Sequence, residues 1–300
     1  MGERYRTLVN VFEHYTNDLF KRIGVDRSES TWWRYRASLG HLRAFLKHEY
    51  NLHDIPLFEL EQSFIEQYHV YLKSDLGLKP TTVSGYLKCL KYVVKIAFNN
   101  GWMPRTPFSL YQYTAPNPER SFLTEDELRR MMTTELRYKR QDYNRDMFLF
   151  SCFTGICYAD MASLTYDRIE QDAQGEWWIS GNRQKTETKY VVKLLPYALF
   201  ILNKYRGLTG DGRVFAMSTL DSIDDSLKNI ARECGIDKQL SFHLARHTYA
   251  TTICLSNGVS LETLSKMLGH KNITTTQIYA KVTPPMIDRE VTMLLSLIHI

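Results

Sequence analysis

The residues of this sequence best suited to chemistry lie in its C-terminal region. His243 and Arg246 are three residues apart, His270 follows them, and Tyr279 lies nine residues beyond His270. An arginine fork can bind two oxygens of a phosphate, and a tyrosine hydroxyl can attack the phosphorus. A histidine can accept the proton of that hydroxyl or hydrogen-bond the phosphate. Together these groups indicate attack on a phosphodiester without a metal ion.

Each of these residues alone is more often structural than catalytic. The chain has 19 tyrosines, and most tyrosines serve packing. The joint pattern is more specific: His-x-x-Arg-His-Thr begins at His243, and Leu-Gly-His ends at His270. On a helix, the spacing of His243 and Arg246 places both side chains on one face. Tyr279 lies in a polar segment, 274–280, that we expect to be flexible.

The composition is that of an ordinary globular protein with a mild positive charge. Its 300 residues suggest two domains, at about 100–200 residues each. Residues 1–118 hold 15 Lys and Arg against 11 Asp and Glu, and residues 119–300 hold 23 against 22. This excess is compatible with nucleic-acid binding without proving it. The five cysteines form no Cys-x-x-Cys pair, which disfavours disulfides and zinc. With no signal peptide or membrane span evident, we expect a cytoplasmic protein.

The first hundred residues predict a bundle of helices. Apolar residues recur at helical spacing over four segments. These are Leu8 to Phe20, a segment that starts at a cap on Ser30 or Thr31 and runs to Leu46, Phe64 to Leu72, and Pro80 to Asn99. The sequence Asn99-Asn100-Gly101 is a good C-terminal cap for the last of them. Prolines 104, 107, 116 and 118 then predict a semi-extended linker. We therefore expect a helical domain over 1–103, a linker over 104–120 and a second domain over 121–300.

The second domain should be mainly α-helical, with a small β-hairpin. Thr124-x-x-Glu127 is a capping box that opens a helix. An apolar helix over Met147–Phe153 should end at Gly155. Trp177–Ile179 and Tyr190–Leu195 predict two strands that enclose a polar hairpin over 181–188.

The C-terminal pattern resembles the signature of tyrosine recombinases, the phage-integrase family. In that signature His-x-x-Arg precedes a Leu-Gly-His turn and a nucleophilic tyrosine. Residues 153–160 resemble the family's Thr-Gly-x-Arg box, residues 183–186 its hairpin with a catalytic lysine, and the N-terminal bundle its core-binding domain. The resemblance covers nearly the whole chain. It implies a helical core-binding domain followed by an α+β catalytic domain.

The resemblance also implies an activity: a site-specific DNA recombinase that cuts and rejoins DNA through a 3′-phosphotyrosyl bond. Such an enzyme needs no metal and no other cofactor. Tyr279 would be the nucleophile, and Arg246, His243 and His270 would act on the phosphate. Lys185 would be the general acid, with Lys189 as its rival and a solvated hairpin charge as the plain alternative. Asp160 would orient catalytic groups or cap a helix.

One position departs from the family pattern. Cys157 stands where the family usually has its first arginine, and a thiol cannot bind a phosphate as a cation does. By analogy with oxyanion donors, this loss costs about 3–4 kcal/mol. Some integrases of mobile conjugative elements also lack this arginine, and the surrounding box resembles theirs. Either the chain is a weakened or non-catalytic DNA-binding relative, or another cation fills the place. We favour an active enzyme, with Arg145 as the first candidate cation and Arg183 as the second.

Partners follow from the same resemblance. We expect duplex DNA attachment sites held in a two-domain clamp, a homotetramer on DNA, and accessory DNA-bending proteins on a bacterial nucleoid. Candidate DNA contacts, each of which could equally be a solvated helix face, are Arg34, Arg36, Lys79, Thr81, Thr82, Lys88, Lys91 and Arg183. An apolar helix over Met286–Leu295 would dock on a neighbouring protomer or pack on its own domain. A type IB-like topoisomerase is the remaining enzymatic alternative.

Overall fold

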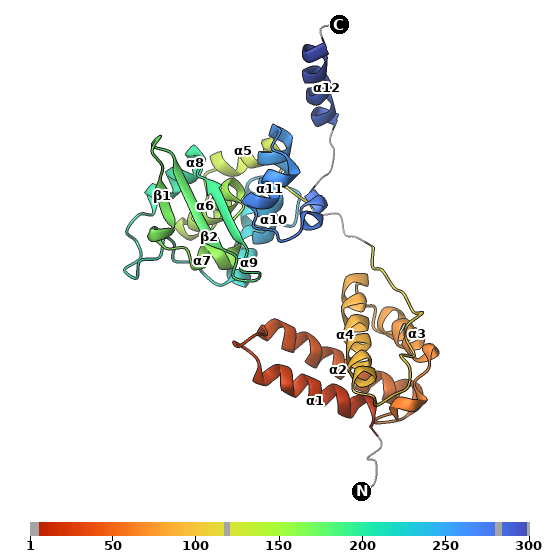
Figure 1. Ribbon diagram of the computed structural model, residues 1–300. Coiled ribbons are helices and arrows are strands. Elements are labelled where there is room, and N and C mark those ends of the chain that lie inside the picture. Colours follow the sequence, from red (N-terminus) through yellow and green to blue (C-terminus); the bar gives the residue numbers. More distant parts are fainter. Residues whose placement is uncertain (1–5, 117–120, 280–283, 299–300) are drawn as a thin grey trace. The chain divides into compact units, whose positions relative to one another are not determined.

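The computed structural model describes residues 6–116, 121–279 and 284–298 (Figure 1). The chain divides into two compact units, Met1–Pro118 and Glu119–Ile300. It is mainly helical with one small antiparallel sheet, as the sequence predicts. None of the helices within the described ranges is long and apolar enough to cross a membrane.

The N-terminal unit is the predicted helical bundle. Its α-helices are α1 (Leu8–Lys21), α2 (Glu29–Tyr50), α3 (Gln62–Val70) and α4 (Pro80–Asn99), with a 3₁₀ turn at Leu57–Glu59 and a π-helical turn at Tyr71–Asp75. The start of α2 differs from the prediction. Its cap is Ser28, whose side chain accepts a hydrogen bond from the Thr31 backbone N–H, so the helix begins before Ser30.

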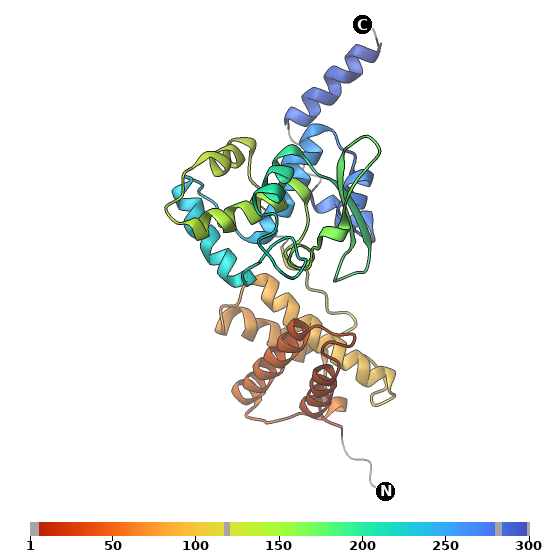
Figure 2. The ribbon, with the colours of Figure 1, turned by 90° about the vertical axis from the view of Figure 1, so that its left-hand side faces the viewer.

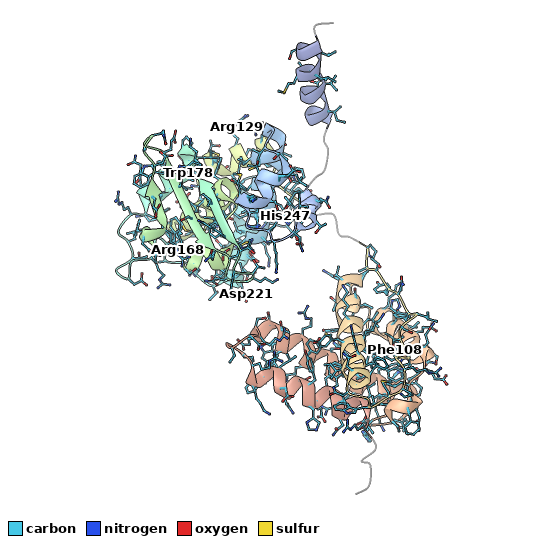
Figure 3. The ribbon with its side chains drawn as sticks, viewed as in Figure 1. Phe108, Arg129, Arg168, Trp178, Asp221 and His247 are labelled. Atoms are coloured by element: carbon cyan, nitrogen blue, oxygen red, sulfur yellow. The ribbon has the colours of Figure 1, made fainter. Side chains whose placement is uncertain are left out.

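The beginning of the predicted linker packs on this bundle. Phe108 is buried in the core of the N-terminal unit together with Met103, and Figure 3 marks Phe108 among its helices. Further along, the Tyr111 hydroxyl lies 2.7 Å from Nδ1 of His69. These contacts fix the segment up to Tyr111, so the proline-rich stretch does not act as one uniform linker.

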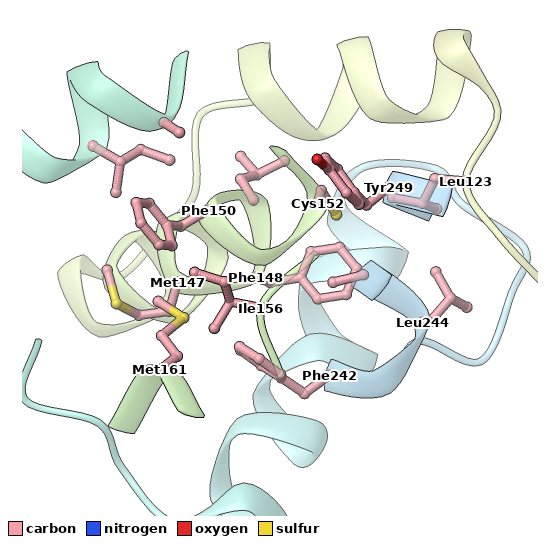
Figure 4. Packing of buried hydrophobic residues seen from close by; sticks show 14 of the residues in the cluster. Leu123, Met147, Phe148, Phe150, Cys152, Ile156, Met161, Phe242, Leu244 and Tyr249 are labelled. Carbon is pink, nitrogen blue, oxygen red and sulfur yellow. The ribbon is translucent and has the colours of Figure 1, made fainter. Parts of the chain in front are cut away.

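The C-terminal unit surrounds a buried helix. Its elements are α5 (Glu125–Thr133), α6 (Lys139–Thr154), α7 (Tyr158–Ala162), β1 (Ile169–Gln171), β2 (Trp177–Asn182), β3 (Lys189–Lys193), α8 (Pro196–Lys204), α9 (Leu220–Glu233), α10 (Phe242–Thr248), α11 (Leu261–Met267) and α12 (Pro284–Ile298). The capping box at Thr124 is present, as predicted. The predicted apolar helix forms the second half of α6, which is buried continuously from Met147 to Cys152. Figure 4 shows Phe148 of α6 beside Phe242 of α10, and the two ring centroids lie 6.4 Å apart.

The sheet has the antiparallel order β1-β2-β3. Ile179 pairs with Val192 on β3 and with Ile169 on β1, and Ile179 and Val192 are both buried. The predicted hairpin is thus confirmed, whereas the short edge strand β1 was not predicted. Figure 2 shows the sheet along one side of the helices of this unit. The β2–β3 hairpin therefore carries residues 183–188 to the edge of the helical core.

Candidate active site

Arg246 is the buried centre of the site. It lies on α10, and the residue is only 3% exposed. Its Nη1 donates to the Gly155 carbonyl at 2.7 Å, and its Nη2 donates to the Leu268 carbonyl at 2.6 Å. No carboxylate of the described residues forms an ion pair with it. The guanidinium is therefore held by neutral carbonyls and keeps its full positive charge for an anion.

Gly155 allows this arrangement. It ends α6 with φ +70°, and a Cβ atom there would lie 2.4 Å from the Tyr249 ring. Only glycine fits both the left-handed backbone and this close approach. The end of α6 can therefore bring its carbonyl against Arg246.

His270 is held from both sides. Its Nε2 lies 2.9 Å from Nη2 of Arg246, and its Nδ1 lies 2.8 Å from the Thr276 hydroxyl. A guanidinium can only donate, so Nε2 must accept and the proton must sit on Nδ1. Burial lowers the pKa of His270, and together with the charges of Arg246 and Arg183 it brings the pKa to about 4. His270 is therefore a neutral imidazole near neutral pH.

Tyr279 is enclosed by imidazole rings. Its ring centroid lies 4.9 Å from that of His247 and 6.1 Å from that of His270, with the latter pair nearly parallel at 4°. His247 in turn meets His243 edge-on at 4.9 Å. Figure 3 labels His247. The residue Tyr279 is 3% exposed, whereas His243 is exposed. The structure thus gathers these residues in one cluster, and it places the tyrosine of the predicted flexible segment in a buried position.

The hairpin contributes a second arginine. Nε of Arg183 lies 2.9 Å from Oδ2 of Asp160, and its Nη1 donates to the Leu268 carbonyl at 3.0 Å. The other oxygen of Asp160 accepts from the Gln184 backbone N–H at 2.9 Å. Arg183 and Arg246 therefore share one acceptor, the Leu268 carbonyl. Asp160 thus holds the hairpin and orients Arg183.

Gly269 lets the hairpin approach this turn. It has φ +62°, and a Cβ atom there would lie 2.9 Å from Cγ of Arg183 and 3.3 Å from the Thr188 carbonyl oxygen. The middle residue of the Leu-Gly-His turn must consequently be glycine for Arg183 to reach the cluster.

Cys157 lies in the same neighbourhood. It precedes α7, and its side chain is partly buried. Three residues further along, Asp160 of α7 pairs with Arg183 at 2.9 Å, so the helix that follows Cys157 holds the hairpin arginine. Burial, with the neighbouring Asp160, raises the pKa of Tyr190 to about 12.

Arg145 is placed elsewhere. Its Nη2 pairs with Asp142 at 3.0 Å, its Nη1 donates to the Thr134 carbonyl, and its Nε lies 3.7 Å from Asp146. Each partner belongs to the region where α5 ends and α6 begins. The structure thus places Arg145 away from the cluster of Arg246, His270 and Tyr279.

The two candidate lysines project from the hairpin. Lys185 lies in the loop between β2 and β3, and Lys189 begins β3; both are exposed. Within the described part of the chain, neither ammonium group makes a hydrogen bond or an ion pair. Either side chain is free to turn toward a bound strand.

The predicted DNA contacts of the N-terminal unit fall into two groups. Exposed on its surface are Arg34, Arg36, Lys79, Thr81 and Lys88, and half-buried are Thr82 and Lys91. Arg36 packs its guanidinium over the rings of Trp32 and Trp33, at 5.2 and 5.0 Å from their centroids. Nζ of Lys91 donates to the Tyr111 carbonyl at 2.6 Å, so this lysine holds the packed part of the predicted linker.

Comparison with known proteins identifies this arrangement. The profile described as Phage integrase family matches residues 121–285, and that of the phage integrase SAM-like domain matches residues 7–115. The chain belongs to the phage integrase family. It is a tyrosine-type site-specific DNA recombinase, an enzyme that breaks and rejoins DNA strands.

Two related recombinases align with this chain along most of their length. The tyrosine recombinase XerD of Oceanobacillus iheyensis is 24% identical over 294 residues, which are 91% of this chain and 95% of that protein. The tyrosine recombinase XerC of Halalkalibacterium halodurans is 26% identical over 301 residues, 88% of this chain and 91% of that protein.

Two solved structures have the same fold as this phage integrase. A lambda integrase dimer bound to a COC′ core site superposes with a TM-score of 0.73 at 17% identity, covering 91% of this chain and 95% of that one. The Tn1549 transposon integrase in complex with circular intermediate DNA gives a TM-score of 0.71 at 16% identity, covering 95% and 99%.

Two side chains of this site, His247 and Thr276, were not among the residues expected from the sequence. His247 is four residues from His243, a spacing that places the two on one helix face. Thr276 is three residues before Tyr279, within three consecutive threonines. The first could have been found from helical spacing. Nothing in the sequence distinguishes Thr276 from its neighbours.

Proposed function

We propose that this recombinase acts on the attachment sites of a mobile DNA element, with Tyr279 as the nucleophile. The Tyr279 oxygen forms a bond to the phosphorus while the bond to the 5′-oxygen breaks. The phosphodiester energy is kept in the 3′-phosphotyrosyl bond, so the strands can be rejoined without ATP. The observation that best supports this proposal is the cluster of three residues: Arg246, whose charge has no counter-ion among the described residues, the neutral His270 and the buried Tyr279.

The other residues of the cluster have separate roles. Arg246 binds the non-bridging oxygens, where a guanidinium fork is most effective. His243 hydrogen-bonds the phosphate or takes up the proton of the tyrosine. The Nε2 atom of His270 carries no proton, so this imidazole serves as an acceptor of that proton. Lys185, at the position that resembles the family's hairpin lysine, protonates the departing 5′-oxygen. Like that of Lys189, its exposed ammonium group has no partner among the described residues and is free to do so.

Arg183 takes the place of the arginine missing at Cys157. Three observations support this assignment over Arg145. Arg183 shares the Leu268 carbonyl with Arg246, its charge lowers the pKa of His270, and it pairs with Asp160, three residues after Cys157. A second guanidinium is thereby available within the cluster.

Assembly involves the C-terminal helix. Ile287, Val291 and Leu294 of α12 follow the i, i+4, i+7 spacing of one helix face and are 52%, 46% and 54% exposed. We expect this stripe to dock on a neighbouring protomer and to build a homotetramer on two DNA sites. Accessory DNA-bending proteins of the nucleoid would bring these sites together.

The first test is covalent trapping with Tyr279→Phe. On a nicked attachment-site duplex, the parent should form a protein–DNA adduct that survives a denaturing gel. The variant should form none yet bind the duplex with unchanged affinity, because the phenol oxygen alone is removed. Tyr138→Phe, at an exposed tyrosine, is the matched control and should form the adduct. An adduct that persists in Tyr279→Phe would show that the nucleophile is another residue.

A further inference from the structure

Thr276 has an unusual position for a residue of a polar segment. It joins the 3₁₀ turns Ile273–Thr275 and Gln277–Tyr279, and it is 0% exposed. Its neighbours Thr274 and Thr275 are both exposed. One of three consecutive threonines is therefore buried, and a buried hydroxyl needs a hydrogen-bond partner.

The contacts of Thr276 reach two members of the cluster. Its hydroxyl lies 2.8 Å from Nδ1 of His270, and its carbonyl accepts from the Tyr279 backbone N–H at 2.9 Å. Since Nε2 of His270 accepts from Arg246, the Nδ1–H donates to the threonine hydroxyl. One residue thus links the imidazole through its side chain and the tyrosine through its backbone.

We propose that Thr276 is a positioning residue that fixes the Nδ1–H tautomer of His270 and ties this imidazole to the nucleophile-bearing turn. The proposal rests on the proposed function of Tyr279 and His270. Without the hydroxyl, the buried Nδ1–H has no acceptor, and the ring is free to turn about its Cβ–Cγ bond. With it, the nitrogen that faces Arg246 is always the unprotonated Nε2, which is the atom of His270 able to take up the proton of the Tyr279 hydroxyl.

Thr276→Val, Thr276→Ser and Thr275→Val test the proposal. Valine keeps the shape and removes the hydroxyl, serine keeps the hydroxyl, and Thr275→Val makes the same change at the exposed neighbour. Single-turnover adduct formation on the nicked duplex should slow about 100-fold in Thr276→Val, as expected for a misplaced reacting group. DNA affinity should not change, and Thr276→Ser and Thr275→Val should retain most of the parental rate.

Two outcomes of this kinetic test would overturn the proposal. One is a Thr276→Val enzyme that forms the adduct at the parental rate. The other is a Thr276→Ser enzyme as slow as Thr276→Val while thermal melting shows both folded, since the lost methyl would then be responsible.

A second measurement does not depend on cleavage. In the DNA-free protein, ¹⁵N spectra of the imidazoles should show a protected Nδ1 proton on His270, assigned by its loss in His270→Gln. The proton should persist in Thr276→Ser and exchange rapidly in Thr276→Val. A protected proton in folded Thr276→Val would refute the positioning role. If the spectra agree but the parent forms no adduct, the proposed function falls while the tautomer assignment stands.

Discussion

At the scale of residues, the two arginines of the site differ in the groups that contact their guanidinium charges. The Leu268 carbonyl accepts from both Arg183 and Arg246, and the Asp160 carboxylate offsets only the former. Arg246 has no such counter-ion among the described residues. Arg246 should therefore attract an anion more strongly than Arg183, because Asp160 offsets part of the charge of Arg183.

The two candidate replacements for the missing arginine give opposite predictions. Arg183→Gln should lower the cleavage rate by about 100-fold or more, because a donor to the transition-state charge is lost. Arg145→Gln should instead lower the free energy of unfolding by about 1–3 kcal/mol, because the partly buried Asp142 and Asp146 lose a hydrogen-bonded partner. Cleavage kinetics and urea unfolding on both variants decide between them. A folded Arg145→Gln without cleavage, beside a normal Arg183→Gln, would reverse the assignment.

His270 predicts how stability depends on pH. Its folded-state pKa of about 4 lies below the ordinary value of about 6.5, so the unfolded chain takes up the proton first as pH falls. The free energy of unfolding should therefore decline on acidification between about pH 6.5 and pH 4. The matched control is His270→Gln, in which the free energy of unfolding should decline less steeply. Burial also lowers the pKa of His41 and His69, and both histidines are present in the parent and in this variant, so the difference in slope belongs to His270. Equal slopes in urea unfolding would contradict the prediction.

At the scale of elements, turns decide where the hairpin sits. Gly269→Ala adds a Cβ atom against Arg183 and the Thr188 carbonyl, whereas Gly207→Ala has open space around it. Both positions have positive φ, so each substitution should cost about 1 kcal/mol of backbone strain. Only Gly269→Ala should also lose cleavage, because the hairpin with Arg183 and Lys185 is pushed from the cluster. Melting temperatures and adduct formation measured together test this, and equal cleavage by the two variants would count against it.

The helices were predictable where a local signal exists. The capping box at Thr124 and the glycine after α6 are complete within a few residues, so the sequence alone places these helix ends. The start of α2 was misplaced because Ser28, Ser30 and Thr31 are all good caps. Strand β1 has only three residues, too few for an alternating pattern to be visible.

The site was predictable only in part. The motifs identify the residue types, and the structure brings His243, Arg246, His270 and Tyr279 together. Position along a helix gives distance but not direction: the Arg145 side chain pairs with groups where α5 ends and α6 begins, away from the cluster. The buried role of Thr276 depends on tertiary contacts with His270, which no local pattern encodes.

At the scale of the whole molecule, the exposed stripe of α12 predicts a separation of cleavage from recombination. Val291→Asp with Leu294→Asp should leave adduct formation on an isolated half-site unchanged, because neither residue belongs to the cluster. Tetramers on DNA and recombinant products from a two-site substrate should be lost, because a charge replaces each apolar contact. Native gels and product analysis measure the two effects. Normal recombination by this double variant would refute docking through α12.

If Tyr279 is the nucleophile, as we propose, its burial bears on the fidelity of cleavage. The residue is only 3% exposed and its phenol lies beside imidazole rings, so it must become exposed before it can attack a phosphate. We expect docking on a correct site to cause this exposure, which would spare a chromosome from cleavage at duplexes that the protein merely touches.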